Sequence, residues 1–378
     1  MTRVVALVFG LALLAGCADG AEDVEPFVML DGFVFCTVCE LAIGPSDTLE
    51  AESEQGLVPG RPRDLDVASD GRMAAVFSSA GEPMWFDRAG RIIGVVGPFG
   101  DGPGEYRSPH VLVPTPDSLI VFEYLGRVTA VDVRSEDVRT GPVLPFVIED
   151  AIVLSWPDRV VVSYGLGPPV GTVHSLAVFD LSGRNAELIA EFEPWSQRTD
   201  ARVLHRRHIA KSSGDTFWAV DYADYRITRR DVSGRILAEA RRNAEWAPDG
   251  SADSRYGPSI PPPPRMQAVH QDQNSRVWVM TRAARADWET AWTSRGITEV
   301  HREMPADSLP RPDELFQSRI EVFSANLDTL LVSEALPLLA DRFVSDGRLL
   351  RYSLTEVGFP IIELMDVRLA DRDRPGSS

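Results

Sequence analysis

Several patterns that would identify an enzyme are missing from this sequence of 378 residues. It has no Gly-x-Ser-x-Gly nucleophile elbow, no His-Glu-x-x-His zinc motif and no Gly-x-x-x-x-Gly-Lys-Ser/Thr phosphate-binding loop. The glycine-rich stretch 97–104 lacks the lysine of such a loop, and no helix is expected after it. The common hydrolase and nucleotide-binding mechanisms are therefore not predicted.

The sequence also lacks a net positive charge. The formal net charge is −18, and lysine is nearly absent although arginine is abundant. A nucleic-acid partner would require a basic face, and binding to anionic lipid headgroups would require basic clusters. The charge therefore predicts no nucleic-acid partner, and an apolar share of 44% is normal for a globular protein with a sizeable core.

No apolar run is long enough for a permanent membrane-spanning helix, because Val4–Ala15 is too short. This run follows a positive start and ends in Leu-Ala-Gly-Cys, which resembles the lipobox of bacterial lipoproteins. The resemblance implies a signal peptide over 1–16, lipidation of Cys17, a tether over 17–45 and anchoring to a membrane through the lipid. Ala18 stands where aspartate would favour inner-membrane retention, which implies an outer-membrane lipoprotein facing the periplasm or the cell surface. An ordinary secretory signal with an incidental cysteine is the alternative.

Only two further cysteines exist, and they form the pair Cys36-Thr-Val-Cys39. Outside the cytoplasm such a pair is most simply a small disulfide ring. A thioredoxin-like redox pair would need a βαβ setting, and a zinc site would need two more ligands. The disulfide is the favoured interpretation, and the other two remain open.

A short phrase recurs along the chain: an apolar strand, Asp-x-x-Gly-Arg, and another apolar strand. It occurs at 85–93, 178–184 and 230–237, with degenerate copies at 130–134 and 322–327. The aspartate side chain caps a tight turn and the glycine supplies the positive φ that closes a hairpin. Repeats of about 40–50 residues made of short strands are typical of propeller blades. The sequence predicts an all-β, six-bladed β-propeller over 46–370 with four-stranded antiparallel blades.

The loop Gly100-Asp-Gly-Pro-Gly-Glu-Tyr106 after the first blade makes the resemblance more specific. Together with the lipobox, the Cys-x-x-Cys pair and the Asp-x-x-Gly-Arg turns, it resembles the bacterial six-bladed β-propeller lipoproteins with NHL-like blades. That largely uncharacterised family implies a fold and a location in the cell envelope, but little chemistry.

Three segments do not fit the regular blade. Residues 47–53 alternate like a strand, and we expect them to close the ring by joining the last blade, because an open edge would stay unpaired. Residues 281–318 are expected to form an insertion in blade five. The terminal residues 371–378 are expected to be a disordered tail.

The innermost strand of each blade lines the axial channel of a propeller, so polar residues near the starts of these strands are candidate ligands. The candidates are His110, His208, His270, Asp66, Asp150 and Asp341. If all of them converge at one mouth, imidazole and carboxylate could bind a divalent cation such as Zn²⁺ or Ca²⁺. The simpler interpretation is that the histidines cap strand ends or form hydrogen bonds in loops.

These observations favour a binding or scaffold role over catalysis. We expect a lipid-anchored propeller that presents loops to an envelope protein, a peptide or a glycan. The alternative is a metal-dependent lactonase- or lyase-like enzyme with its site at the channel mouth, which depends on fold analogy alone.

Overall fold

The computed structural model describes residues 28–29, 36, 39–50, 52–53, 56–57, 60–77, 82–164, 174–194, 207–244, 246–248, 256–300, 308–355 and 358–371. The signal peptide 1–16, the lipidation residue Cys17 and residues 372–378 of the expected tail lie outside these described residues. Residue 371, by contrast, is the last residue of a strand.

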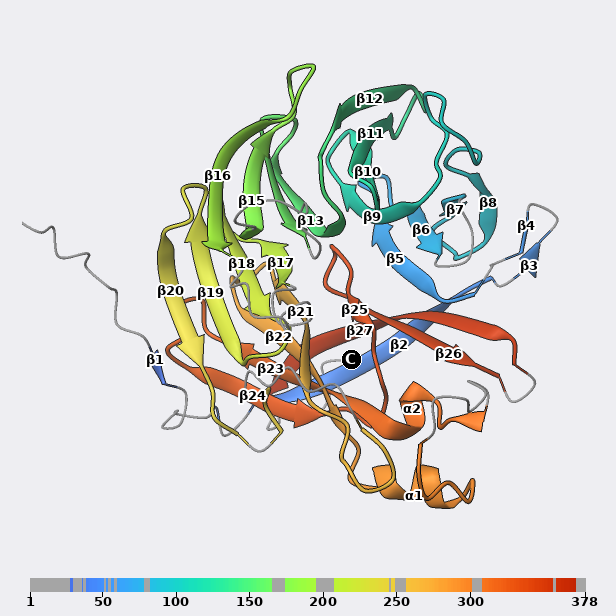
Figure 1. The fold of residues 1–378 in the computed structure, drawn as a ribbon, viewed down its shortest axis with the longest axis vertical. Coiled ribbons are helices and arrows are strands. Elements are labelled where there is room, and N and C mark those ends of the chain that lie inside the picture. The colour runs from blue at the N-terminus through green and yellow to red at the C-terminus, as the bar shows by residue number, and fades with distance from the viewer. Residues whose placement is uncertain are drawn as a thin grey trace, which may run out of the picture.

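The chain forms six antiparallel four-stranded blades around a common centre, as Figure 1 shows, so the predicted six-bladed propeller is confirmed. Blade one contains β5 (Pro62–Val67), β6 (Met73–Phe77), β7 (Met84–Phe86) and β8 (Ile92–Val95). Blade two contains β9 (Pro109–Pro114), β10 (Ser118–Glu123), β11 (Arg127–Asp132) and β12 (Val138–Val143). Blade three contains β13 (Ile148–Ser155), β14 (Arg159–Tyr164), β15 (His174–Asp180) and β16 (Glu187–Pro194).

The remaining three blades follow the same order. Blade four contains β17 (Arg207–Lys211), β18 (Thr216–Asp221), β19 (Arg226–Asp231) and β20 (Ile236–Arg241), and β1 (Val28–Met29) pairs parallel to its outer edge. Blade five contains β21 (Arg265–Gln271), β22 (Val277–Ala284), β23 (Phe316–Phe323) and β24 (Leu330–Ala335). Blade six contains β25 (Arg342–Phe343), β26 (Leu349–Leu354), β27 (Pro360–Asp371) and β2 (Cys39–Leu49). The short hairpin of β3 (Glu52–Ser53) and β4 (Gly56–Leu57) precedes blade one.

The recurring aspartates form the turns that the sequence predicts. Asp87 accepts hydrogen bonds from the backbone N–H groups of Ala89 and Arg91 at 2.9 Å, while Gly90 has a φ of 80°. Asp231 repeats this arrangement with Arg235 at 3.1 Å, and Gly234 has a φ of 86°. In each turn the aspartate carboxylate, instead of water, accepts the hydrogen bonds of the backbone N–H groups. This holds the turn in one conformation and so fixes the register of its hairpin.

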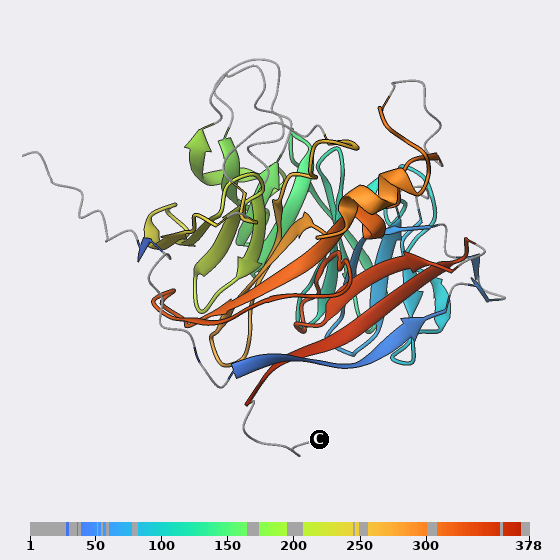
Figure 2. The same ribbon diagram turned by 90° about the horizontal axis from the view of Figure 1, so that it is seen from below.

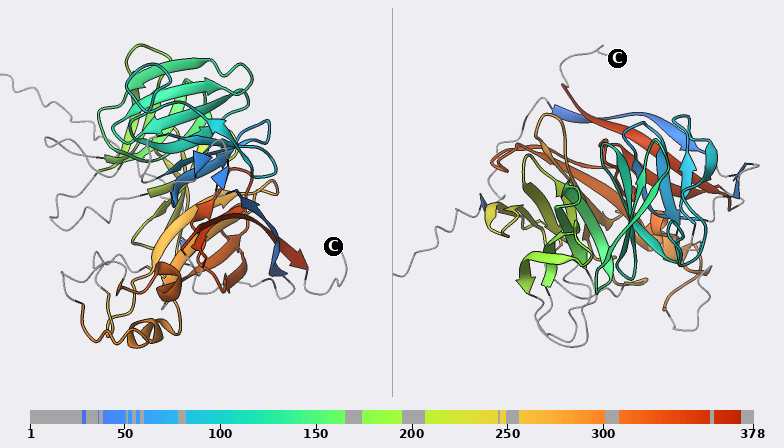
Figure 3. Two further views of the ribbon diagram at one scale, coloured as in Figure 1. Left: turned by 90° about the vertical axis from the view of Figure 1, so that its right-hand side faces the viewer. Right: turned by 90° about the horizontal axis from the view of Figure 1, so that it is seen from above.

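Apolar clusters lie between neighbouring blades and hold the ring together. One cluster joins blades two and three and contains Ile120, Phe122, Val162 and Phe179, and another joins blades six and one and contains Leu49, Phe86 and Leu364. Comparable clusters occupy the other four interfaces, so every blade packs against two neighbours. Figure 3 shows the sheets of successive blades side by side. The ring is therefore stabilised by burial of apolar surface between sheets.

Strand β2 closes the ring, as expected, but it begins at Cys39 and ends at Leu49 instead of running over 47–53, and residues 52–53 form β3. It pairs antiparallel to β27 from Cys39 opposite Asp371 to Leu49 opposite Ile362. Residues 39–45, which we assigned to the tether, therefore belong to the propeller. The pairing is irregular between Ile43 and Ser46, where Gly44 and Pro45 lie. Proline is tolerated there because β2 is an edge strand with a local irregularity.

The insertion in blade five is shorter than predicted. Strands β22 and β23 extend to Ala284 and from Phe316, so the insertion occupies 285–315 instead of 281–318. It contains α1 (Trp288–Thr293) and α2 (Pro312–Leu315). Buried Trp292, Ile297 and Leu315 pack against Phe316 and Leu339 at the base of the insertion. The insertion is thus packed onto the blade through its own apolar cluster.

The propeller has two different faces. Turns from the first to the second strand and from the third to the fourth strand lie on one face, which we call the short-turn face. Connections from the second to the third strand, and from each blade to the next, lie on the opposite face, which we call the long-loop face. Helices α1 and α2 belong to the long-loop face, and Figure 2 shows them opposite β2. Inner strands therefore begin at the long-loop face and end at the short-turn face.

Candidate functional site

The inner strands line an axial channel with a cavity at each end. The cavity at the long-loop face has a volume of about 380 Å³, and the one at the short-turn face about 440 Å³. We call them the long-loop cavity and the short-turn cavity. Both are lined by Asp150, Ile209, Val269, Arg342 and Phe343. These shared residues separate the two cavities at the middle of the channel.

The six predicted site residues do not converge at one mouth. His110, His208 and Asp341 line the long-loop cavity, whereas Asp66 and His270 line the short-turn cavity, and Asp150 lines both. The physical reason is position along the strand. His110 and His208 are second in β9 and β17, but His270 is sixth in β21 and Asp66 is fifth in β5. At about 3.3 Å per residue, four positions move a side chain by roughly 13 Å along the channel.

The long-loop cavity is polar and carries charges of both signs. An Arg63 guanidinium N–H donates to His110 Nδ1 at 2.6 Å, and the His110 and Tyr124 ring centroids lie 5.2 Å apart. Because arginine can only donate, Nδ1 of His110 is the acceptor and its proton lies on Nε2. Arg61 forms an ion pair with Asp341, which also accepts the Tyr352 backbone N–H at 2.7 Å. Burial nevertheless raises the pKa of Asp341.

Carboxylates connect neighbouring blades at the channel. Asp64 accepts the backbone N–H of Leu112 in blade two at 2.7 Å, and Asp150 accepts that of Ile209 in blade four at 3.1 Å. Asp66 accepts that of Ser345 in blade six at 2.8 Å. An inner strand has one edge without a partner strand, and these side chains satisfy its donors. Asp66 and Asp150 therefore have a structural role that the sequence analysis did not assign to them.

Arg342 is the central cation of the channel, and sequence reasoning missed it. Its guanidinium donates to Asp64, which is 1% exposed. Burial, followed by the charge of Asp64, raises the pKa of Asp66 to about 7, and burial raises the pKa of Asp150 to about 6. The sequence held one indication of this cation, the Asp64-Leu-Asp66 pattern. Alternate residues of a strand point to the same side, so two neighbouring carboxyl groups there indicate a positive partner.

The described residues do not form the metal centre considered above. Among them, no three His, Cys, Asp or Glu side chains are grouped so that they could hold a metal ion. His208 Nδ1 lies 3.8 Å from Asp150, but His110 contacts Arg63 instead, and burial lowers the pKa of His270 at the other cavity. The three candidate histidines thus have different surroundings at the two mouths.

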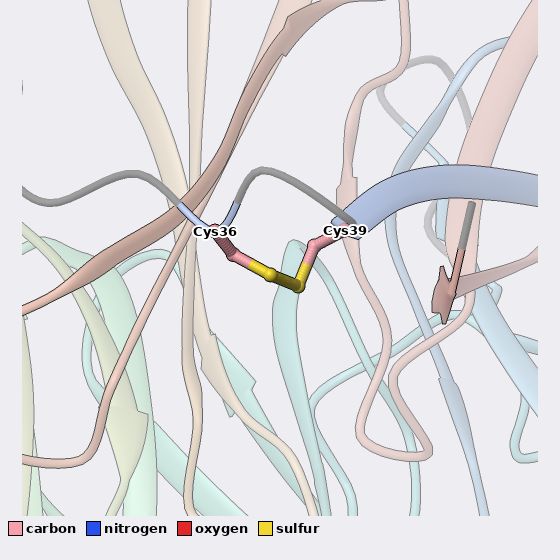
Figure 4. The surroundings of a disulfide bond; sticks show 2 residues. All are labelled: Cys36 and Cys39. Carbon is pink, nitrogen blue, oxygen red and sulfur yellow. A yellow bond between two sulfur atoms is a disulfide. The ribbon is translucent and has the colours of Figure 1, made fainter. Parts of the chain in front are cut away.

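The cysteine pair lies at the start of the closing strand. A disulfide joins Cys36 to Cys39, the first residue of β2, as Figure 4 shows. Within the described part of the chain, no helix has the length and apolar character needed to cross a membrane.

Comparisons with known proteins support the architecture. No protein-family model and no curated protein matches the sequence. Two solved structures are similar in fold: a DUF4221 family member from Bacteroides vulgatus and a protein from Bacteroides fragilis described as exported. The first has a TM-score of 0.55 at 10% identity and aligns with 89% of this chain and 100% of its own. The second has a TM-score of 0.56 at 11% identity and aligns with 91% of this chain and 100% of its own. At such low identity, these likenesses establish that the chain shares a fold with both proteins.

Proposed function

We propose that this protein is an outer-membrane lipoprotein that binds an envelope protein, a peptide or a glycan through its long-loop face. The lipobox-like sequence at Cys17 supports the anchor, and the similarity to a protein described as exported is compatible with it. The observation that carries the binding role is the coincidence of a polar cavity and exposed apolar side chains on one face.

The exposed apolar residues are unevenly distributed. Most large apolar side chains that are exposed in the described residues lie in, or at the strand ends beside, the connections of the long-loop face: Phe99, Leu125, Val143, Tyr256, Ile260, Val300, Leu354 and Phe359. The turns of the short-turn face carry no exposed large apolar side chain among the described residues. Binding surfaces combine apolar anchors with polar groups, whereas scattered single residues would show no preference for one face.

A photo-crosslinking experiment in intact cells tests this face. A photoreactive amino acid at Leu125 or Phe359 is expected to give a discrete adduct, since both residues are more than half exposed beside the long-loop connections. The matched positions are Ala89 and Asn274, which are exposed in turns of the opposite face. Protease and glycosidase digestion of the adduct then distinguishes a protein or peptide from a glycan. Equal adducts from both faces, or none from the long-loop face, would contradict the proposal.

The anchor has a separate test. The wild-type protein is expected to incorporate a clickable palmitate analogue and to begin at Cys17. It should also enter the detergent phase, because the acyl chains supply about 0.8 kcal/mol per buried CH₂ group. Cys17→Ala is expected to lose the label completely, while Cys36→Ala keeps it. Intact mass and detergent-phase partition measure the outcome. A wild-type protein without label, or one processed at another residue, would refute the anchor and leave the binding face untouched.

The enzyme alternative receives no comparable support. It depended on fold analogy alone, and the histidines considered for a metal site do not share a cavity, because the structure places His270 at the opposite end from His110 and His208. We therefore do not propose a lactonase- or lyase-like metal site.

A further inference from the structure

The short-turn cavity lies at the opposite end of the channel from the proposed binding face. Its lining is about equally polar and apolar, and the apolar part comes from four inner strands, including Leu112 and Val113 of β9, Val153 of β13, Ile209 of β17 and Val269 of β21. The volume of about 440 Å³ is within the range of pockets that bind small molecules. This cavity is suited to a compact ligand with an apolar body.

The inner end of this cavity contains more carboxyl groups than cations. Asp66 and Asp150 line the cavity and are 7% and 6% exposed, Asp64 is 1% exposed and does not belong to the lining, and Arg342 is the guanidinium beside all three. Arg342 donates a hydrogen bond to Asp64. Asp66 and Asp150, by contrast, accept hydrogen bonds from the backbone N–H groups of Val67, Ser345, Ala151 and Ile209. Among the described residues, no cationic side chain donates a hydrogen bond to these two buried carboxyls.

The other ionisable groups at this cavity do not fill that position. Lys211, the only lysine of the chain, is exposed at the rim, and its Nζ donates to the carbonyl of Leu154 at 3.1 Å. Asp272 is paired with Arg276 at 2.6 Å, and burial lowers the pKa of His270, which favours a neutral ring. The imidazole of His208 lies 3.8 Å from Asp150, but His208 lines the other cavity.

A second observation is independent of the carboxyl groups. Ser212 lines the same cavity, is only 7% exposed, and its hydroxyl has no hydrogen-bond partner among the described residues. Buried hydroxyl groups are normally satisfied, so one without a partner at a cavity wall indicates that a group is missing there. This hydroxyl is a second group of the lining, besides the carboxyls, that a polar ligand can satisfy.

We propose that the short-turn cavity binds a small protonated primary amine whose apolar body packs against the apolar part of the lining. The ammonium group donates hydrogen bonds to Asp66 and Asp150, which then stay ionised. A primary amine fits better than a quaternary one, because the carboxyls need donors and, among the described residues that line the cavity, Phe343 is the one Phe, Tyr or Trp. This inference does not depend on the proposed function, which concerns the other face.

Three probes that share one ring and differ in charge test the proposal: benzylammonium, benzyl alcohol and benzoate. Isothermal titration of the full mature chain is expected to show benzylammonium binding at least about tenfold more tightly than the other two. Affinity should rise from pH 6 to pH 8, because burial raises the pKa of Asp66 to about 7 and that of Asp150 to about 6, and ionisation supplies the acceptors.

Variants make the test specific. Asp66→Asn is expected to weaken the binding of benzylammonium about tenfold and to flatten the pH dependence of that affinity. Asp272→Asn, at the rim of the same cavity, is the matched control and should bind like the wild type. If Asp66→Asn does not fold, Ser213→Trp serves instead, because Ser213 is exposed at the mouth and the larger ring would block entry. Preference for benzoate, equal binding of benzyl alcohol, or no saturable binding of any probe would overturn the proposal.

Discussion

Arg342→Met is expected to lower the free energy of unfolding by about 3–5 kcal/mol at pH 8, since breaking a buried ion pair leaves charge without compensation. The variant keeps most of the side-chain volume but removes the cation beside Asp64, Asp66 and Asp150. Denaturant titration followed by tryptophan fluorescence measures the change. Arg351→Met is the matched control, because its ion pair with Glu363 lies outside the channel and is partly exposed.

The pH dependence gives the Arg342 experiment a second readout. Burial raises the pKa of Asp66 to about 7 and that of Asp150 to about 6, and the charge of Arg342 opposes both increases. Groups with a raised pKa in the folded state stabilise it at low pH, and this contribution is lost as pH rises through the folded pKa. The wild type should therefore lose stability between about pH 4 and pH 7 from these two groups.

Without Arg342 the pKa of each carboxyl rises further, so the loss extends to higher pH. The difference between variant and wild type should then be smallest near pH 4.5, where the carboxyls are protonated in both. A difference that is independent of pH would show that Arg342 stabilises the channel through packing and not through its charge.

Removal of the closing strand is expected to abolish the native fold. A chain that starts at residue 51 loses β2, its pairing with β27 along 39–49, and the Leu49 side chain that packs between blades six and one. Strand β27 would become an open edge, which promotes association between chains. Far-ultraviolet circular dichroism, thermal melting and size-exclusion chromatography measure the result.

The control for this truncation is a chain that starts at residue 26. It loses the signal sequence and the lipid attachment but keeps β1 and β2, so it should melt like the full mature chain. A chain without β2 that remains monomeric and melts at the same temperature would show that the ring does not need its closing strand.

The fold could be predicted because its signal is local. Each Asp-x-x-Gly-Arg turn encodes its own hairpin through one side chain and one positive φ, as Asp87 and Gly90 show. The start of the closing strand could not be predicted, since Gly44-Pro45 reads as the end of a strand. Residues 39–43 belong to the sheet because β2 pairs with β27 both before and after Gly44-Pro45, and this long-range pairing has no local signal in the sequence.

The site was harder to predict because it depends on position along strands whose starts are uncertain by a few residues. Asp66 and His270 are inner-strand residues, as expected, but they lie at the ends of β5 and β21 and not at their starts. Arg342 belongs to a strand of two residues, which carries almost no periodic signal. Its importance appears only when blades one, three and six bring Asp64, Asp150 and Arg342 to one point.

The parallel pairing of β1 with β20 determines where the leading segment of the chain leaves the propeller, namely at the rim of blade four. Between Cys17 and Val28 there are eleven residue steps, which reach about 40 Å at full extension. With a lipid at Cys17, this segment would keep the rim of blade four within about 40 Å of the bilayer surface. Because the attachment is on the rim and not on a face, the disc could stand on edge and leave both ends of its channel accessible from the sides.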